Sequence, residues 1–488
     1  MNIVERNEMD PNYSKRKDDF QQHAEKTAHS RDDWIEKNQF YYENDYRYMR
    51  FLVPEGLRVL DLGCGTGRLL YEVKPRKGVG VDLSPEMIMT AKSKYTEFEF
   101  FVGDAEDPKF IKELNGPFDI IIISDTIGSL SDCQLALENL HPLCSPQTRI
   151  IIAYHSVGWA PILLAAQWFG LRMPQPQQNW LTTDDIVNLL SLSRFEVIKR
   201  EWRQLIPKTL FGFGSFVNRF VAPLPLIRRF CLRNYVVARP APYQIQQKRP
   251  QSATILIPCR NERGNIESAI KRIPAFCKDM EIIYVEGGSS DGTLDEIKRV
   301  IKKYSKKDIK VLVQRGLGKG DAVRLGFGEA RGEVLMILDA DLTMPPEDLP
   351  KFFKAIASGQ GEFINGSRLV YPMEDDAMRF LNLVANKIFS WLFTWLLNQR
   401  FTDTLCGTKV LRKSDYELIK QNRSYFGVFD PFGDFDLIFG AAKLNMKVVE
   451  VPVRYAERVY GETQISRFKH GWLLIKMVIF AFRKLKAF

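Results

Sequence analysis

Two aspartates separated by one residue follow an apolar run in the second half of the chain. The residues from Val334 to Leu338 are all apolar, and Asp339 and Asp341 come directly after them. Such a run is typical of a strand buried on both faces of a mostly parallel sheet, and open α/β sheets bind ligands at the carboxyl ends of their strands. Carboxylate oxygens suit Mg²⁺ or Mn²⁺, and such a cation often bridges a protein to substrate phosphates. The pair indicates a metal site for phosphate chemistry, with a structural cap or chance occurrence as the alternatives.

A glycine-rich turn in the N-terminal half indicates a second ligand site. A strand from Arg58 to Leu62 contains Asp61 and runs into Gly63-Cys64-Gly65-Thr66-Gly67. Glycines let the backbone approach a ligand closely, and the following helix adds the positive end of its dipole. The next strand ends at Asp82, about twenty residues further on, where an acid is placed to bind ribose hydroxyls.

Two more strands with polar ends follow the glycine turn, and we expect them at residues 98–102 and 118–123. Four successive strands of this kind resemble the class I S-adenosylmethionine-dependent methyltransferases, and the resemblance covers residues 35 to 240. It implies that Asp61, Gly63, Gly65 and Gly67 cradle the methionine part of S-adenosylmethionine, that Asp82 binds its ribose, that Asp104 and Ala105 flank its adenine, and that Ser124, Asp125 and Thr126 line the reacting end.

Methyl transfer asks little chemistry of the protein, because a sulfonium is a good leaving group and alignment does most of the work. An oxygen acceptor also needs a base. His155, at the end of the fifth expected strand, is the candidate, and Asp125 is a second candidate catalytic residue. A hydrogen-bonded histidine with no role in catalysis is the alternative. A nicotinamide site is less favoured, because the chain lacks a dinucleotide loop of the Gly-Gly-Gly type.

Three strands with polar ends precede the aspartate pair, at residues 254–257, 281–286 and 311–314. This regular βαβ spacing predicts a second doubly wound sheet. The blocks resemble the family 2 glycosyltransferases of GT-A fold, and among them the polyprenyl-phosphate (dolichyl-phosphate mannose or glucose) synthases, from about residue 253 to 470. The resemblance implies that Pro258, Arg260, Glu262 and Glu286 bind the nucleotide, that Lys319 lies near its base and phosphates, and that Asp339 and Asp341 hold the metal, with Asp341 also catalytic.

The same resemblance extends to the acceptor side of the site. Arginine suits a lipid phosphate, because its planar guanidinium binds phosphate oxygens in pairs. By the resemblance, Arg368 and Arg379 face the lipid phosphate, Asp403 lines the sugar pocket, Asp434 and Asp436 are catalytic candidates near it, and Arg458 lies on a loop that contacts diphosphate or lipid phosphate.

Three positions depart from the synthase pattern. Gly287 stands where synthases usually have a second acid, which leaves the preferred base, uridine or guanosine, open. Thr343 stands where they tend to have a glutamine as an additional metal ligand. Gln464 stands where they often have a lysine that would contact phosphate.

Composition limits the class of protein. The chain has 488 residues and a net charge of +10, from 69 Lys and Arg against 59 Asp and Glu. This length predicts two or three domains, and the charge fits anionic lipid, phosphorylated substrates or nucleic acid. The cysteines are scattered without a CxxC pair, which favours a reducing compartment over a disulfide framework or a zinc site. With a polar N-terminus and no apolar run of roughly 18 residues, we expect neither a signal peptide nor a membrane span.

Four apolar stretches are rich in aromatic residues. Those at 158–169 and 210–230 would be insertions over the methyl-acceptor pocket, and we expect a lid packed on its own domain rather than contact with a bilayer. Those at 380–397 and 472–488 carry asparagine or cationic residues that would be costly at the centre of a bilayer. For these two we expect amphipathic helices lying in the membrane interface, with packed core helices as the alternative.

The predicted fold class is α/β, with two doubly wound Rossmann-like domains, a methyltransferase sheet and then a GT-A domain, and with amphipathic interfacial helices. The expected segments are a polar N-terminal extension (1–34), a methyltransferase domain (35–240), a linker (241–252), a glycosyltransferase domain (253–470) and a C-terminal amphipathic helix (471–488).

We expect a bifunctional enzyme, cytoplasmic and peripheral at the inner face of the membrane. One domain would transfer a sugar from a nucleotide-sugar to a polyprenyl phosphate or lipid-linked glycan, and the other would methylate a related glycan or lipid intermediate, in cell-surface glycan synthesis. The alternative is a glycosyltransferase that carries a non-catalytic methyltransferase-like docking module. Nucleic acid is not an expected partner, because no base-flipping Asn-Pro-Pro-Tyr loop follows the fourth strand.

Overall fold

The computed structural model describes residues 11–242, 249–368, 380–426, 433, 435–456, 458, 460 and 467–487. The chain divides into two compact units, 1–246 and 247–486. Each unit is built on one seven-stranded sheet.

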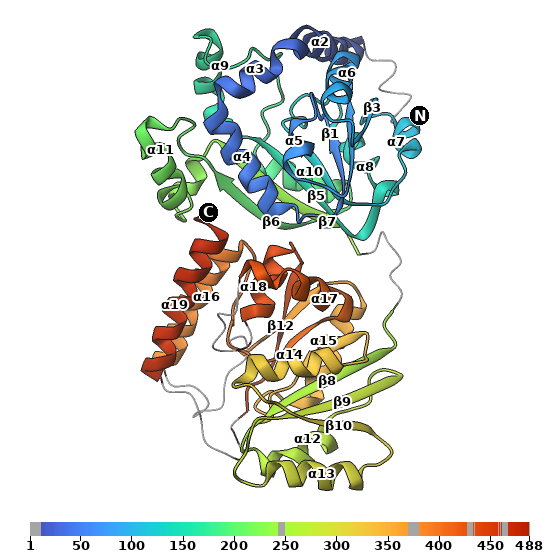
Figure 1. Cartoon of the computed structure of the whole chain (residues 1–488), viewed down its shortest axis with the longest axis vertical. Coiled ribbons are helices and arrows are strands. Elements are labelled where there is room, and N and C mark those ends of the chain that lie inside the picture. The colour runs from blue at the N-terminus through green and yellow to red at the C-terminus, as the bar shows by residue number, and fades with distance from the viewer. Residues whose placement is uncertain are drawn as a thin grey trace. The chain divides into compact units, whose positions relative to one another are not determined.

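The sheet of the first unit has the strand order β3-β2-β1-β4-β5-β7-β6 (Figure 1). β1 pairs in parallel with β2 and β4, whereas β7 runs antiparallel between β5 and β6. In this register Leu62 lies opposite Val81 and Ile123, so the central strands end at one edge of the sheet. The strands are β1 (Arg58–Leu62), β2 (Lys77–Asp82), β3 (Glu99–Val102), β4 (Phe118–Ser124), β5 (Cys144–His155), β6 (Phe195–Arg203) and β7 (Arg233–Pro240).

Capping residues fix where helices of this unit begin, and apolar side chains pack the helices against the sheet. The side chain of Ser84 accepts a hydrogen bond from Met87 N, with a proline at the first position of the helix that follows. Leu60, Ile121 and Ile150 are fully buried in the core. The helices that bear on the site are α2 (Pro11–Thr27), α3 (Arg31–Lys37), α4 (Gln39–Leu52), α5 (Arg68–Glu72), α6 (Pro85–Lys94), α9 (Ala160–Trp168) and α10 (Thr183–Leu192).

The sheet of the second unit has the order β10-β9-β8-β11-β13-β12-β14. β11 pairs in parallel with β8 and antiparallel with β13. All four residues of β11 are buried, as the apolar run predicted. The strands are β8 (Ser252–Cys259), β9 (Asp279–Glu286), β10 (Asp308–Val313), β11 (Val334–Ile337), β12 (Phe363–Ser367), β13 (Lys409–Arg412) and β14 (Val448–Pro452).

Two long helices of the second unit, α16 (Phe380–Leu397) and α19 (Arg467–Leu485), pack against each other. Each buries one face and exposes apolar residues on another. Phe393 and Met477 are buried, whereas Trp391 and Trp472 are exposed. No helix among the described residues is long and apolar enough to cross a membrane. The other helices of the unit are α12 (Ile266–Arg272), α13 (Thr293–Lys303), α14 (Lys319–Glu329), α15 (Leu349–Ala357), α17 (Lys413–Gln421) and α18 (Phe435–Lys443).

The predicted α/β class with two doubly wound sheets is confirmed. Both sheets are mixed, because β7 in the first unit and β13 in the second run antiparallel to their neighbours. The linker expected at 241–252 lies between β7 and β8, and residues 243–248 lie outside the described part.

Candidate active sites

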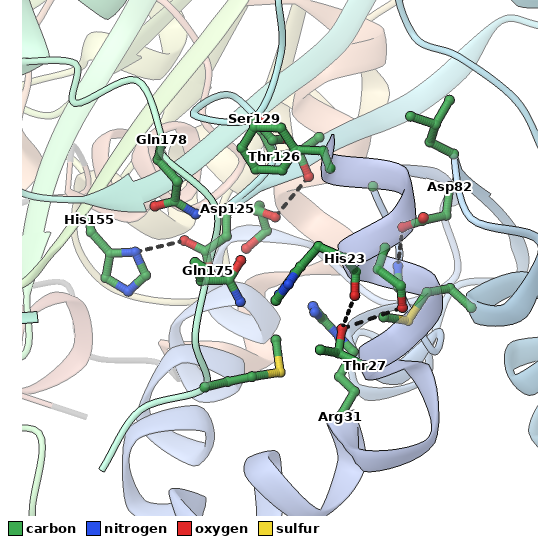
Figure 2. A pocket seen from close by; sticks show the side chains of 18 of the residues that line it. His23, Thr27, Arg31, Asp82, Asp125, Thr126, Ser129, His155, Gln175 and Gln178 are labelled. Carbon is green, nitrogen blue, oxygen red and sulfur yellow. Dashed lines mark hydrogen bonds and ion pairs between the residues drawn. The ribbon is translucent and has the colours of Figure 1, made fainter. Parts of the chain in front are cut away.

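The first unit contains a cavity of about 450 Å³ at the carboxyl ends of its central strands (Figure 2). The cavity brings together most of the site residues that the sequence predicted in this half. Asp61 and Gly67 are not part of its wall: Asp61 is buried within β1, and Gly67 precedes α5. The predicted residues that line the cavity are Gly63, Gly65, Asp82, Asp104, Ala105, Ser124, Asp125, Thr126 and His155.

The glycine turn has a backbone that only glycine adopts easily. Gly63, Gly65 and Gly67 have φ angles of 77°, 53° and 80°. A Cβ atom at Gly63 would lie 2.0 Å from Oγ1 of Thr126, so no side chain fits there. The amide of Gly65 donates to the Asp82 carboxylate over 2.9 Å, which holds that acid at the turn. A tight turn beside a strand-end acid fits the methionine and ribose parts of S-adenosylmethionine.

Asp61 lies beneath this turn in an unfavourable environment for a charge. Burial, and then the neighbouring Asp82, raise the pKa of Asp61 to about 7, although Arg31 acts in the opposite direction. The folded state therefore holds the proton more tightly than the unfolded chain, in which the pKa is near 3.8.

This shift predicts a pH-dependent effect of Asp61→Asn on stability. Because the folded-state pKa is the higher one, the Asp61 contribution falls as pH rises from about 4 to about 7 and is constant above that. The variant should therefore gain stability relative to the wild type between roughly pH 5 and pH 7. Thermal unfolding of both proteins across this range measures the difference. The exposed Asp184, changed to asparagine, is the control; a difference that is flat with pH would contradict the shift.

The segment expected as a polar extension forms one wall of the cavity. Lys17, on α2, forms ion pairs with Asp104 and with Glu106, the latter at 3.2 Å. Figure 2 shows His23, Thr27 and Arg31 facing the cavity from this segment. In the sequence, Phe20, His23, Ala24 and Thr27 recur at helical spacing, a signal that could have identified a helix with one face turned inward.

A polar cluster lies at the end of the cavity where the methyl acceptor is expected. Nδ1 of His155 is 3.3 Å from the Asp125 carboxylate (Figure 2). Its Nε2 is 3.0 Å from the hydroxyl of Tyr41. Arg233, on β7 and fully buried, donates to Asp45 over 3.0 Å and also pairs with Asp125. The cluster joins α4, β4, β5 and β7, so it forms only when the sheet is complete. Tyr41, Asp45 and Arg233 were not predicted. The signal in the sequence for Arg233 is a charged residue at the start of an otherwise largely apolar strand.

The environment of this cluster fixes its charge states. Burial, and then nearby Arg233 and Arg172, lower the pKa of His155 to about 3 despite the opposing effect of Asp125. Burial would raise the pKa of Asp125, but the Arg233 guanidinium and His155 outweigh it and the net direction is downward. The cluster therefore presents a neutral imidazole whose Nδ1 faces the Asp125 carboxylate and whose Nε2 meets the hydroxyl of Tyr41, which also lines the cavity.

In the second unit, predicted nucleotide-binding residues follow β8 and β9. Glu286 accepts a hydrogen bond from Ser289 N over 2.5 Å, and Arg260 is exposed. Glu262 is buried, accepts from Asn265 Nδ2 over 2.7 Å and lies 3.4 Å from Arg458. Pro258 lies in β8 beside Val285 of β9.

The aspartate pair after β11 is surrounded by cationic groups. Asp339 lies 2.8 Å from the Lys319 ammonium, and Asp341 lies 2.7 Å from the Arg458 guanidinium. Burial would raise the pKa of Asp339, but Lys319 outweighs this and lowers it. A Cβ atom at Gly407 would lie 1.7 Å from the Asp339 carboxylate, so glycine is needed there.

These residues fit a metal that is held mainly through its substrate. Thr343 donates to Asp341 from its amide and, over 2.9 Å, from its hydroxyl, so it orients the carboxylate. Within the described part of the chain, no group of three or more His, Cys, Asp or Glu is placed to hold a metal. Two carboxylates with the remaining positions left to water and phosphate is the pattern typical of Mg²⁺.

The other predicted residues of the second unit are in separate contacts. Arg368 forms a bidentate ion pair with Asp403, with hydrogen bonds of 2.6 and 2.8 Å. Burial alone would raise the pKa of Asp403, but Arg368 lowers it. Asp436 accepts from Arg423 over 2.8 Å. Arg379 and Asp434 lie outside the described residues.

Each unit contains a segment that matches the model of a known domain family. Residues 54–194 match the methyltransferase domain model, and residues 254–417 match the glycosyl transferase family 2 model. A solved S-adenosylmethionine-dependent methyltransferase from Thermotoga maritima, a possible histamine N-methyltransferase, is 17% identical with a TM-score of 0.35, over 45% of this chain and 99% of that one. Glucosyl-3-phosphoglycerate synthase from Mycobacterium tuberculosis is 17% identical with a TM-score of 0.35, over 48% of this chain and 80% of that one.

Two curated relatives align with the second half. The undecaprenyl-phosphate 4-deoxy-4-formamido-L-arabinose transferase of Edwardsiella ictaluri (strain 93-146) is 26% identical over 225 residues, 45% of this chain and 64% of that protein. The dolichol-phosphate mannosyltransferase of Pyrococcus furiosus is 32% identical over 217 residues, 44% of this chain and 59% of that protein. The chain thus spans less than two thirds of each. It joins two transferase domains in one polypeptide, a methyltransferase domain and a family 2 glycosyltransferase domain.

Proposed function

We propose that the chain is a bifunctional enzyme of lipid-linked glycan synthesis. Its second domain transfers a sugar from a nucleotide-sugar to a polyprenyl phosphate or lipid-linked glycan, and its first domain methylates a related glycan or lipid intermediate. The observation that carries the proposal is the aspartate pair after β11, with Lys319 and Arg458 beside it. Relatives that are named as undecaprenyl-phosphate and dolichol-phosphate sugar transferases also support the proposal.

The residues of the second domain are suited to hold a diphosphate. Asp339 and Asp341 would hold Mg²⁺ or Mn²⁺, which would supply positive charge to stabilise the departing diphosphate. Lys319 and Arg458 already lie at these two carboxylates, so their positive charges are within reach of the same phosphate oxygens. Glu262 holds Arg458 from the other side at 3.4 Å, which keeps the guanidinium over the site.

The long helices of this domain support a peripheral position at the membrane. α19 exposes Trp472, Ile475 and Ile479 at helical spacing, and the cationic Arg483 is exposed near its end. α16 exposes Ile388 and Trp391. Aromatic and aliphatic side chains flanked by cations suit the boundary between headgroups and acyl chains, where a polyprenyl phosphate presents its phosphate.

In the first domain, S-adenosylmethionine supplies the methyl group as an activated sulfonium. The glycine turn and Asp82 orient the donor, and the cavity places the reacting end beside Ser124, Asp125 and His155. A pKa of about 3 keeps the His155 imidazole neutral, with Nδ1 toward Asp125, so its Nε2 can accept a hydrogen bond from the acceptor hydroxyl. As a weak base it takes that proton only once the new carbon–oxygen bond has made the proton strongly acidic. The Tyr41 hydroxyl contacts Nε2 over 3.0 Å, and the hydroxyl of the acceptor replaces it there when the acceptor binds.

The test is a double-label assay on the purified full chain with native membranes. Radiolabelled nucleotide-sugars and methyl-labelled S-adenosylmethionine are added separately, and label in the lipid-soluble fraction is counted. We expect sugar label that is abolished by a chelator and restored by Mg²⁺ or Mn²⁺, and methyl label that does not need the metal. Absence of sugar transfer from a panel of uridine and guanosine diphosphate sugars would overturn the assignment of the second domain.

A docking module without methyltransferase activity is the second candidate for the first domain. Calorimetry with S-adenosylmethionine separates it from an enzyme, because a docking module would bind the donor without turnover in the same membranes. The lining of the cavity by a strand-end acid and an imidazole favours the enzyme. If a His155→Gln variant binds the donor and methylates at the wild-type rate, the imidazole has no role in methyl transfer.

A further inference from the structure

Two insertions of the first domain expose large apolar side chains, contrary to the expectation of a lid packed on its own domain. The first insertion is 157–172 and contains α9; the second is 205–230 and contains α11 (Phe213–Phe216). Trp168 is 85% exposed, Phe211 111% and Leu226 84%. Monomeric proteins seldom present such a collection of large apolar groups unless a partner covers them.

The backbone at the tip of the second insertion holds one of these side chains out in solvent. Leu210, Phe211 and Gly212 have φ angles of 44°, 55° and 93° in succession. Bulky residues rarely adopt this left-handed conformation, which costs of order 1–3 kcal/mol, and such strain concentrates at functional contacts. The backbone conformation at the tip of this loop therefore costs free energy, and it leaves the side chain of Phe211 exposed.

The charge pattern of the two insertions identifies the kind of partner. Neither 157–172 nor 205–230 contains an aspartate or a glutamate. Lys208, Arg219 and Arg229 are exposed among the aromatic side chains. Tryptophan and phenylalanine with interleaved cations and no acids suit an anionic bilayer interface, where the rings enter the acyl boundary and the cations meet phosphates.

The same insertions form part of the cavity wall. Leu163, Leu171 and Arg172 contribute from the first insertion, and Lys208 contributes from the second. The insertions touch each other where Trp159 Nε1 donates to the carbonyl of Phe230 over 2.8 Å. Both insertions therefore border the cavity, and each contributes one cationic side chain, Arg172 or Lys208, to its wall.

We infer that these insertions dock the methyltransferase domain on an anionic bilayer, and that its methyl acceptor is a lipid-linked saccharide bearing phosphate. The inference rests on the proposed methyl transfer and specifies its substrate class. The lipid part stays in the bilayer beside Trp168 and Phe211, and the saccharide reaches the cavity past Arg172 and Lys208, which pair with the phosphate. The acceptor oxygen then lies near His155 without the lipid leaving the membrane.

Hydrogen exchange measured by mass spectrometry on the full chain tests the docking. Vesicles of roughly 70% phosphatidylcholine and 30% phosphatidylglycerol are the probe. We expect slower exchange in peptides from 160–169 and 210–230. Protection confined to 380–397 and 467–485 would overturn this inference and leave the proposed sugar transfer at the membrane intact. Protection without vesicles that grows with protein concentration would assign the surface to a second copy and also overturn it.

A matched pair of variants provides the second measurement. Phe211→Asn with Leu226→Ser removes two exposed apolar groups, and asparagine tolerates the left-handed backbone. We expect vesicle affinity and methyl label in the lipid fraction to fall about tenfold, with sugar transfer unchanged. The control pair, Met89→Ser with Leu192→Ser, removes side chains that are 58% and 53% exposed on α6 and α10. An equal effect of both pairs, or no effect of the first, would overturn the inference.

Discussion

Replacing Asp341 with alanine is expected to lower sugar transfer by about three orders of magnitude, because it removes one of only two predicted protein ligands of the metal. The change also leaves Arg458 without the carboxylate that it contacts at 2.7 Å. Excess Mn²⁺ should restore little activity, since Asp339 alone cannot hold the cation against Lys319. Initial rates with a nucleotide-sugar and native membranes measure the effect.

The control for Asp341 is Asp295→Ala, which removes a carboxylate that is 88% exposed on the surface of α13. This variant should transfer sugar at the wild-type rate. Methyl transfer should be unchanged in both variants, because both residues belong to the second domain. An Asp341→Ala protein that folds and transfers sugar normally would contradict the assignment of Asp341 as a metal ligand.

Arg233→Met is expected to destabilise the first domain by about 3–5 kcal/mol, because it leaves the buried Asp45 carboxylate, with the cavity-lining Asp125 beside it, without a countercharge. Arg233 is fully buried and contacts both Asp45 and Asp125, so no water can replace it easily. Burial alone would lower the pKa of Arg233, but the two carboxylates outweigh it and raise the value. Denaturant unfolding measures the loss, with the transition of the second domain as an internal reference.

Two further variants separate charge from packing at Arg233. A double variant, Arg233→Met with Asp45→Asn, should recover part of the lost stability, because one unpaired charge is removed together with its partner. Arg200→Met, on β6, breaks a contact between side chains that are 38% and 90% exposed and should cost under about 1 kcal/mol. Equal losses for Arg233→Met and Arg200→Met would show that the buried cluster contributes no more than a surface pair.

The strand ends and the glycine turn could be predicted because their signals are local. A buried run such as Val334 to Ile337 appears as consecutive apolar residues, and its polar ends follow at once in the sequence. The left-handed backbone at Gly63 is likewise a local requirement. The resemblance to known families then indicated which strand of the sheet each sequence block forms. The positions of Asp82 and Asp339 at a sheet edge could therefore be predicted from the sequence.

The contacts that the sequence did not reveal join residues far apart in the chain. Lys17 meets Asp104, and Arg233 meets Asp45 across a sequence separation of 188 residues. Composition also cannot tell an exposed aromatic surface from a packed lid, because Trp168 and Phe211 would occur in either. The pairing of Arg368 with Asp403 is another case, since the resemblance assigned each to a substrate and not to the other.

The wall that α2 and α3 add to the cavity has a practical consequence for dissecting the protein. The family likeness of the first domain starts at residue 54, downstream of Lys17, Arg31 and Tyr41. A fragment excised at that point would keep the glycine turn and lose the side chains that close over Asp104 and His155. Its failure to bind a donor would then reflect the cut and not the chemistry, so truncations should begin upstream of α2.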